Sequence, residues 1–347
     1  MRTFLSGSYN PISFRHIRTL TDSRGILEHA QGTIPRYSHG YCTDDNARLL
    51  IVAARDGLQT AETEELAYTA MKFLLEAQNS DGTMHNRMSV SHEWTDEPTA
   101  EDCWGRAMWA LGTAASHRST DMWHKRALEA FELSAQQHSP WLRSNCFAAL
   151  GAAEILKVLP NNAAARRVLK EAVAMIPLHS SIRLDPSIIY SGWMWPEQSL
   201  RYANAILPEA LIASGQYLDN DGHLERGLQL LDWLVSTETK CGHLSVTPTS
   251  GRKYKQSSPI FDQQPIEIAA IADASWRAAA ATKDAHWLNS YAKCVNWFHG
   301  DNDNGMPMID YDSHGGYDGL TKEGVNLNQG AESTLAMLAT LQERTLS

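Results

Sequence analysis

Two pairs of adjacent acidic residues give the clearest indication of chemistry in this sequence of 347 residues. They are Asp44-Asp45 and Glu101-Asp102, and each pair directly precedes an apolar segment. A helix start needs one acidic cap, because its free N–H groups and dipole attract negative charge. A second carboxylate beside a buried helix costs desolvation energy unless it pairs or binds a ligand. Arg48 and Arg106 lie three and four positions after Asp45 and Asp102, so a structural ion pair could engage one acid of each pair.

Further polar residues occur where other long loops lead into apolar segments. Two carboxyl groups that flank a glycosidic bond can cleave it, one as acid and the other as nucleophile or base. Their separation, about 5–5.5 Å or about 6.5–9.5 Å, distinguishes retention from inversion, and the sequence leaves this open. We predict catalytic carboxylates at Asp44, Asp45, Glu101, Asp102 and Glu197. We predict polar substrate contacts from Arg48, Arg106, Asp262, Gln263, Asp318 and Glu332.

Aromatic residues occur in or beside the same loops. The simplest interpretation of a tryptophan is that it fills the core, and this suits those in the middle of helical segments. Near acidic residues, however, indole rings suit the apolar faces of sugar rings and leave polar edges for hydroxyl groups. We therefore predict substrate contacts from Trp94, Trp104, Trp193 and Trp195. Acids and aromatics together favour a carbohydrate substrate.

Other site chemistries lack their motifs. The 14 histidines show no HExxH spacing, and the five cysteines include no CxxC pair. Asp301–Gly305 differs from a calcium loop because its glycine stands at the fifth position and no glutamate closes it. Phosphate-binding glycine loops and GxSxG elbows are also absent. We expect no metal and no cofactor.

Charge and composition limit the partners. The formal net charge is −10, which disfavours nucleic acids and anionic membrane surfaces. The first residues lack the apolar run of a signal peptide, and no apolar stretch of about 18 residues occurs. We expect a cytoplasmic protein with reduced thiols. Assembly into a homo-oligomer is left open.

Two kinds of helical segment alternate along the chain and must position these residues. Segments with polar and apolar residues at helical spacing are predicted to be outer helices, at 12–21, 65–78, 121–137, 163–176, 223–237 and 285–299. Segments rich in Ala and Gly are predicted to be buried inner helices, at 46–54, 103–115, 144–156, 198–213, 266–281 and 331–341.

The alternation defines a repeat of roughly 58 residues, a period typical of helical hairpins. We find no polar capping repeats at the ends, so a closed ring is favoured over an open array. Connections from outer to inner helices are long at 79–100, 179–196, 238–261 and 300–329. Such loops are commonly functional, and in a ring they emerge on one face. We predict one all-α domain over residues 1–347, an (α/α)6 barrel with its site on that face.

Six such hairpins with acids at the inner-helix starts resemble the six-hairpin glycosidase superfamily over essentially the whole chain. The sequence Tyr41-Cys42-Thr43-Asp44-Asp45-Asn46-Ala47 also looks like the paired-aspartate motif of bacterial endo-α-1,6-mannanases, in which both carboxylates are assigned to catalysis. It differs by Arg48, where an aromatic residue commonly follows. Epimerases of this fold use histidine bases at helix starts, whereas Asp and Glu stand here.

The resemblance and the acids together favour a glycoside hydrolase acting on an oligosaccharide or polysaccharide. Two alternatives remain. One is another sugar enzyme of this fold, namely a disaccharide phosphorylase, a sugar epimerase or a lyase. The other is a non-catalytic toroid that binds carbohydrate or a protein partner.

Overall fold

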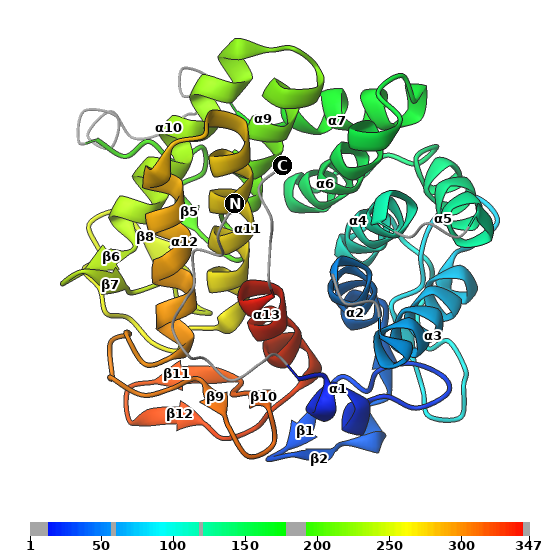
Figure 1. The fold of residues 1–347 in the computed structure, drawn as a ribbon, viewed down its shortest axis with the longest axis horizontal. Helices are drawn as coiled ribbons and strands as arrows, with labels where there is room; N and C mark the ends of the chain where they lie inside the picture. The colour runs from blue at the N-terminus through cyan, green and yellow to red at the C-terminus, as the bar shows by residue number, and fades with distance from the viewer. Residues whose placement is uncertain (1–12, 57–59, 118–120, 178–191, 343–347) are drawn as a thin grey trace.

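The computed structural model describes residues 13–56, 60–117, 121–177 and 192–342. Its helices form an outer and an inner layer around a common centre (Figure 1). The outer helices are α1 (Arg15–Leu20), α3 (Ala61–Ala77), α5 (Asp121–Ser134), α7 (Ala163–Ala174), α10 (Asp221–Thr237) and α12 (Ala285–Phe298). The inner helices are α2 (Thr43–Arg55), α4 (Asp102–His117), α6 (Leu142–Val158), α9 (Ile206–Tyr217), α11 (Pro265–Thr282) and α13 (Ala331–Leu341).

The inner helices close into a ring. Each packs against the next along the chain, from α2 through α4, α6, α9 and α11 to α13, and α13 packs against α2. The outer helices α3, α5, α7, α10 and α12 each pack against an inner neighbour. The (α/α)6 barrel predicted from the sequence is therefore confirmed. Within the described ranges, no helix combines the length and apolar character needed to cross a membrane.

Small residues let the inner helices approach closely, most clearly between α4 and α6. A side chain added at Gly112 would overlap the backbone carbonyl of Gly151, and one at Gly151 would overlap the carbonyl of Met108. The two helix backbones therefore touch without intervening side chains. Close contact of this kind explains why the inner segments are rich in Ala and Gly.

The fourth inner helix begins later than we predicted. The sequence pattern placed its start at residue 198, but α9 starts at Ile206. Before it, β5 (Ser199–Leu200) pairs with β8 (Arg252–Lys253), and Ala203 has a positive φ of 45°. Pro208 carried the missed signal, because proline fits the first turn of a helix but breaks its interior. Residues 179–191 of the predicted loop 179–196 lie outside the described ranges.

Short antiparallel strand pairs organise the long loops. Besides β5 and β8, they are β1 (Ala30–Gln31) with β2 (Ile34–Pro35), β3 (Tyr41–Cys42) with β4 (Arg87–Met88), β6 (Thr239–Lys240) with β7 (His243–Leu244), β9 (Ile309–Asp310) with β10 (Gly315–Gly316), and β11 (Gly319–Thr321) with β12 (Gly324–Asn326). The pair β3–β4 fixes the start of α2 against the loop that leads to α4.

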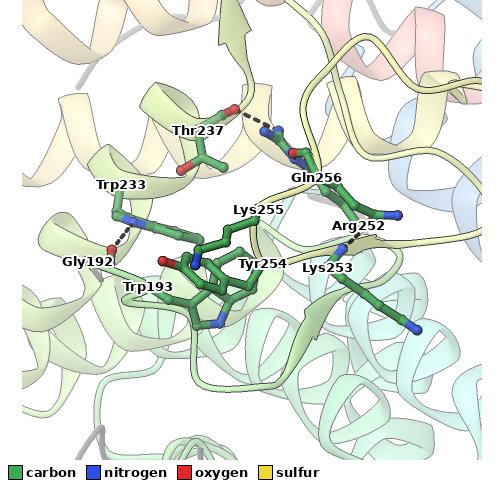
Figure 2. Close-up of a pocket in the computed structure, with 9 residues that line it drawn as sticks. All are labelled: Gly192, Trp193, Trp233, Thr237, Arg252, Lys253, Tyr254, Lys255 and Gln256. Atoms are coloured by element: carbon green, nitrogen blue, oxygen red, sulfur yellow. Dashed lines mark hydrogen bonds between the residues drawn. The ribbon is translucent and has the colours of Figure 1, made fainter. Parts of the chain in front are cut away.

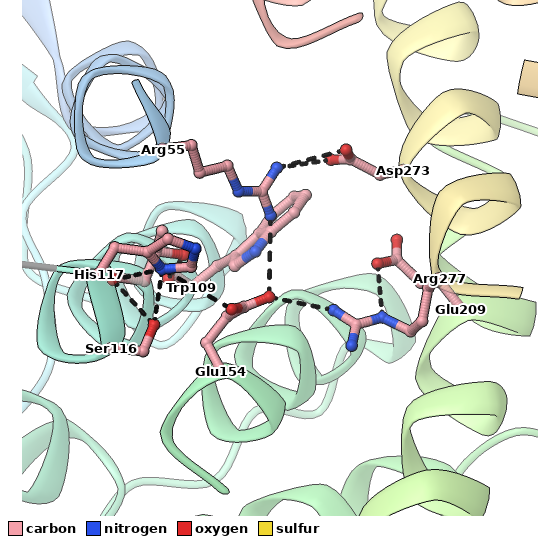
Figure 3. Close-up of polar contacts among 9 residues, drawn as sticks. Arg55, Trp109, Ser116, His117, Glu154, Glu209, Asp273 and Arg277 are labelled. Atoms are coloured by element: carbon pink, nitrogen blue, oxygen red, sulfur yellow. Dashed lines mark hydrogen bonds and ion pairs between the residues drawn. The ribbon is translucent and has the colours of Figure 1, made fainter. Parts of the chain in front are cut away.

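A buried ionic network links five of the inner helices, with Glu209 in the first turn of α9 and the other members further along their helices (Figure 3). Arg277 of α11 binds Glu209 of α9 through Nε at 2.9 Å and Glu154 of α6 through Nη2 at 3.2 Å. Arg55, at the end of α2, binds Asp273 of α11 at 3.2 Å and lies 4.0 Å from Glu154. The network also includes His117 at the end of α4, 3.9 Å from Glu154.

Burial sets the electrostatics of this network. It raises the pKa of Glu209 to about 7, although Arg277 lowers it. Burial also opposes ionisation of Glu154, but Arg277 and Arg55 outweigh it and the pKa of Glu154 is lowered. The side chains of Arg277, Glu154 and Glu209 are only 11%, 10% and 2% exposed. Loss of one partner would therefore leave a charge with little access to water.

Candidate active site

A cavity of about 430 Å³ opens where the first turns of α2, α4 and α13 meet the residue before α11. Six carboxylates and three arginines are among its lining residues. These are Glu28, His29, Cys42, Asp44, Asp45, Arg48, Arg87, Asp102, Arg106, Gln264, Asp318, Asn326, Gly330, Glu332 and Ser333. The predicted site residues Asp44, Asp45, Arg48, Asp102, Arg106, Asp318 and Glu332 are thus brought together.

Arg48 joins two acids that are far apart in sequence. Its Nη1 lies 2.6 Å from Asp45 Oδ1, and its Nη2 lies 2.6 Å from Glu332 Oε2. The other oxygen of Asp45 accepts a hydrogen bond from Cys42 Sγ at 3.1 Å. Asp45 is only 2% exposed. Burial raises the pKa of Asp45 to about 6, although Arg48 opposes this rise. Asp45 can therefore change protonation near neutral pH.

Arg106 pairs with Asp44, the other acid of the doublet. Its Nε lies 3.2 Å from Asp44 Oδ1, and its guanidinium stacks over the ring of Phe147 at 4.0 Å. Burial lowers the pKa of Arg106, which the neighbouring Arg48 lowers further. The side chain of Asp44 remains 19% exposed and faces the cavity. Adjacent acids on α2 thus have separate arginine partners and different access to solvent.

Two more carboxylates complete the acidic lining. Asp318 Oδ1 accepts a hydrogen bond from the Gly330 backbone N–H at 2.7 Å, and burial raises the pKa of Asp318. Asp102, at the start of α4, accepts a hydrogen bond from the Tyr202 hydroxyl. The pKa of Tyr202 is raised mainly by its burial and secondly by the negative charge of Asp102. The cavity therefore combines carboxylates in distinct environments, the condition under which one acts as acid and another as base.

Several lining residues were not predicted from the sequence, including Glu28, His29, Cys42, Arg87 and Gln264. Glu28 hydrogen-bonds to Arg87, and its Oε1 lies 3.6 Å from His29 Nε2. Cys42 was detectable, because it stands two and three positions before the acidic doublet in a two-residue strand. Glu28 and Arg87 had no local signal, since their pairing depends on loops separated by 59 positions.

One group of side chains could in principle offer ligand atoms to a cation. Glu28, Cys42 and Asp45 place such atoms within 4.8 Å of one another, and no other group does so in the described part of the chain. Arg87 already neutralises Glu28, and Arg48 neutralises Asp45. Because both acids have a guanidinium partner, a further positive charge would be repelled, and the group does not support a metal proposal.

Two predicted catalytic acids do not line the cavity. Glu197 accepts two hydrogen bonds from Arg143, at 3.0 and 2.9 Å, and a third from Trp195 Nε1 at 3.3 Å. Glu101 is exposed just before α4, where its backbone carbonyl accepts a hydrogen bond from Ser144 at 2.7 Å. The carboxylate of Glu197 is therefore engaged within the fold, whereas the side chain of Glu101 is exposed outside the cavity.

The predicted aromatic contacts also lie outside the cavity. Trp104 and Trp195 are buried at 1% and 0% exposure, and Trp104 donates to the Ser134 carbonyl. Trp94 stacks on the ring of His85 at 5.0 Å. Trp193, at 4% exposure, contacts Trp233 rather than the cavity. Among described residues, no Trp, Tyr or Phe lines the central cavity.

The two remaining polar predictions, Asp262 and Gln263, directly precede the cavity residue Gln264 but do not line the cavity themselves. Gln263 is fully buried and donates to Asp303 at 2.7 Å, while its backbone pairs with Leu320. Asp262 is exposed, and its backbone carbonyl accepts from Thr249. The backbone bridge between Gln263 and Leu320 leaves Gln264 to line the cavity, and the loop sequence does not predict this bridge.

Comparison with known proteins shows the fold. The sequence matches no protein-family model and no curated protein sequence. Its structure is similar to a D-mannose isomerase, with 14% identity, a TM-score of 0.66 and 94% and 93% of the two chains covered. It is also similar to cellobiose 2-epimerase from Bacillus thermoamylovorans, with 10% identity, a TM-score of 0.68 and 95% of each chain covered.

A third similar structure is an α-mannanase from Bacteroides thetaiotaomicron, with 11% identity, a TM-score of 0.61 and 94% and 91% of the two chains covered. The coverage shows that the whole (α/α)6 arrangement is shared, not one hairpin. These neighbours include both a hydrolase and enzymes that rearrange sugars, so the fold alone does not select the reaction.

Proposed function

We propose that this protein is a glycoside hydrolase whose acid and base come from the acidic doublet of α2. The observation that carries the proposal is the unequal environment of Asp45 and Asp44. Asp45 is buried with a pKa raised to about 6, whereas Asp44 is partly exposed beside Arg106. A buried carboxyl group that can carry its proton up to about pH 6, next to a second carboxylate in a more exposed environment, matches the acid and base pair that glycoside cleavage requires.

In the proposed reaction, Asp45 donates its proton to the glycosidic oxygen as the bond from that oxygen to the anomeric carbon breaks. Asp44 accepts a proton from the attacking water, or attacks the anomeric carbon itself before water releases the sugar. Arg106 stabilises the negative charge of Asp44, and Arg48 holds Asp45 against Glu332. Asp102 and Asp318 offer oxygen acceptors for sugar hydroxyls in the same cavity.

The test is a panel of neutral and acidic glycans incubated with purified protein and analysed by mass spectrometry. Hydrolysis adds the mass of one water across the two products and requires no phosphate. Asp45→Asn and Asp44→Asn should each reduce turnover by about 10²–10⁴-fold, the usual contribution of a general acid or base. The matched control is Asp221→Asn, an exposed residue at the start of outer helix α10, which should keep full activity.

Products that form only with phosphate would indicate phosphorolysis instead of hydrolysis. Products that have lost water would indicate elimination. Full activity of both doublet variants on a confirmed substrate would contradict the catalytic assignment. Ligand affinity without turnover across the panel would indicate a binding protein.

A second candidate is sugar epimerisation or isomerisation, and one observation favours it. His29 lies in the cavity 3.6 Å from Glu28, so an imidazole is available to move a proton between carbon atoms. The similar structures of a mannose isomerase and a cellobiose epimerase make this chemistry compatible with the fold. Incubation in heavy water decides between the two, because proton transfer at carbon gives a deuterated isomer without cleavage.

A further inference from the structure

A second pocket, of about 250 Å³, lies away from the central cavity and shares no lining residue with it. It is formed by the C-terminal part of α10, by strand β8 with the three residues after it, and by Gly192 and Trp193. Figure 2 shows its lining residues, which are Gly192, Trp193, Trp233, Thr237, Arg252, Lys253, Tyr254, Lys255 and Gln256. None of these residues has a role in the proposed hydrolysis.

The charge of this pocket is opposite to that of the whole chain. Arg252, Lys253 and Lys255 contribute three cations within four positions, and no acidic residue is among the described lining residues. The chain carries a formal charge of −10, and six carboxylates line the central cavity. A local concentration of cations in an acidic protein favours a negatively charged ligand.

Aromatic rings form one wall. Trp193 meets Trp233 and Tyr254 edge to face, with ring centroids 5.0 and 5.9 Å apart. The ammonium group of Lys255 lies 5.1 Å from the centre of the Tyr254 ring, and Figure 2 shows it beside these rings. Trp233 and Tyr254 are only half-buried. Half-exposed rings beside cations combine an apolar platform with charge.

The polar wall is held in place by hydrogen bonds. Arg252 donates to the Thr237 carbonyl at 2.7 Å and to the Gln256 carbonyl at 3.2 Å. The side chain of Gln256 accepts from the Lys253 backbone N–H at 2.6 Å. Lys255 adopts a positive φ of 65°, an uncommon conformation for a lysine, and this turn presents its side chain above Tyr254. Hydrogen bonds thus fix the Arg252 side chain and the backbone turn that carries Lys253 and Lys255.

We propose that this pocket binds an acidic saccharide, a segment of a chain that contains uronic acid residues. The carboxylate of the sugar pairs with Lys255 and the exposed Lys253, and an apolar sugar face packs on Tyr254 and Trp233. The volume is below the range of about 300–1,000 Å³ for pockets that enclose whole drug-sized ligands, so one or two sugar units fit. The site would hold an acidic glycan on the protein outside the central cavity.

Isothermal titration calorimetry with tri-galacturonic acid and with neutral cellotriose tests this inference. Tri-galacturonic acid should bind at least ten times more tightly, and its affinity should fall as salt screens the charges. The double variant Lys253→Gln/Lys255→Gln should lose about ten-fold in affinity. The control Lys125→Gln/Lys170→Gln removes the same charge from exposed positions on α5 and α7 and should leave the affinity unchanged.

Tyr254→Leu separates a saccharide site from a simple anion site. It should weaken tri-galacturonic acid but leave tripolyphosphate binding unchanged, with thermal melting used to verify that the variant is folded. Equal binding of the two trisaccharides, equal behaviour of the two double lysine variants, or an unaffected Tyr254→Leu variant would each overturn the proposal.

The affinity of the second pocket for tri-galacturonic acid can be measured whether or not the central cavity hydrolyses a glycan. Glu332→Gln alters only that cavity, so it should retain the affinity for tri-galacturonic acid whether or not turnover is found. Loss of binding in Glu332→Gln would instead place the acidic ligand in the central cavity and overturn the assignment to the second pocket.

Discussion

Replacing Arg277 by methionine tests whether the buried ionic network holds the barrel together. Arg277 supplies the hydrogen bond to Glu209 Oε1, and the second oxygen of Glu209 has no hydrogen-bond partner among the described residues. Glu154 keeps Arg55 and His117 as neighbours, but Glu209 loses its nearest cation. Breaking a buried ion pair by removing one partner costs about 3–5 kcal/mol, because an uncompensated charge remains.

This free energy translates into a measurable change of melting temperature. Unfolding entropy is about 2.1 cal/mol/K per residue, which gives about 0.7 kcal/mol/K for this chain. The Arg277→Met variant should therefore melt about 4–7 °C below the wild type, measured by circular dichroism at pH 8. Arg18→Met provides the control, because Arg18 is 54% exposed on α1 and its removal should change stability by less than about 0.5 kcal/mol.

The pH dependence of this variant has a defined sign. The folded state raises the pKa of Glu209 to about 7. Protonation of Glu209 therefore stabilises the folded state fully at a pH below the ordinary pKa of a glutamic acid. This stabilisation is lost as the pH rises to about 7. At pH 5 Glu209 is already protonated, and loss of Arg277 should cost less than at pH 8. The penalty should therefore shrink on acidification.

A double variant distinguishes an unpaired charge from a simple packing defect. Adding Glu209→Leu to Arg277→Met removes the charge that the single variant leaves behind. The double variant should be destabilised by at least about 1 kcal/mol less than the sum of the two single variants, as expected for residues in direct contact. Additive losses, or a loss below about 1 kcal/mol for Arg277→Met, would refute the reasoning.

Three further expectations follow from other parts of the fold. If Asp45 is the general acid, the rate on a substrate found in the glycan panel should fall above about pH 6, and Arg48→Gln should move this limb upward by removing the charge that lowers the Asp45 pKa. Gly112→Ala should destabilise the protein by about 1–3 kcal/mol or more in thermal melts, whereas Gly222→Ala on α10, where the nearest atom is 3.4 Å away, should be tolerated. Burial raises the pKa of Glu267 to about 8. Protonation of Glu267 therefore stabilises the folded state at low pH, and this stabilisation is lost as the pH rises through 8. The melting temperature of Glu267→Gln should consequently fall less between pH 5 and pH 8 than that of the wild type.

Helix periodicity made most of the architecture predictable. Alternating amphipathic and Ala-rich segments predicted the hairpins, and the boundaries of α4, α7, α11, α12 and α13 lie close to those expected. The largest difference is at α9, whose preceding residues Ala203 and Asn204 donate backbone hydrogen bonds to Glu267 on a different inner helix. The local signal of Pro208 and this distant residue thus agree on where α9 begins.

The candidate site was predictable only in part. The doublets on α2 and α4 contributed Asp44, Asp45 and Asp102 to the cavity, as the argument from excess acids suggested. Glu197 had the same local appearance, an acid before an apolar segment, but Arg143 lies beside it and engages both of its oxygens. Whether an acid meets an arginine or a cavity depends on the neighbouring helix.

By itself the sequence determined the periodicity of the helices, the ring that six hairpins form, and the concentration of acids at helix starts. These features are local, because helical faces and capping depend on residues a few positions apart. Only the tertiary structure decided which acids face one cavity, since the bond between Arg48 and Glu332 spans 284 positions. It also separated the loop tryptophans from the central cavity and brought the cationic run at 252–255 beside Trp233 of α10. Such pairings follow from the register of packed helices and loops, which no local pattern encodes.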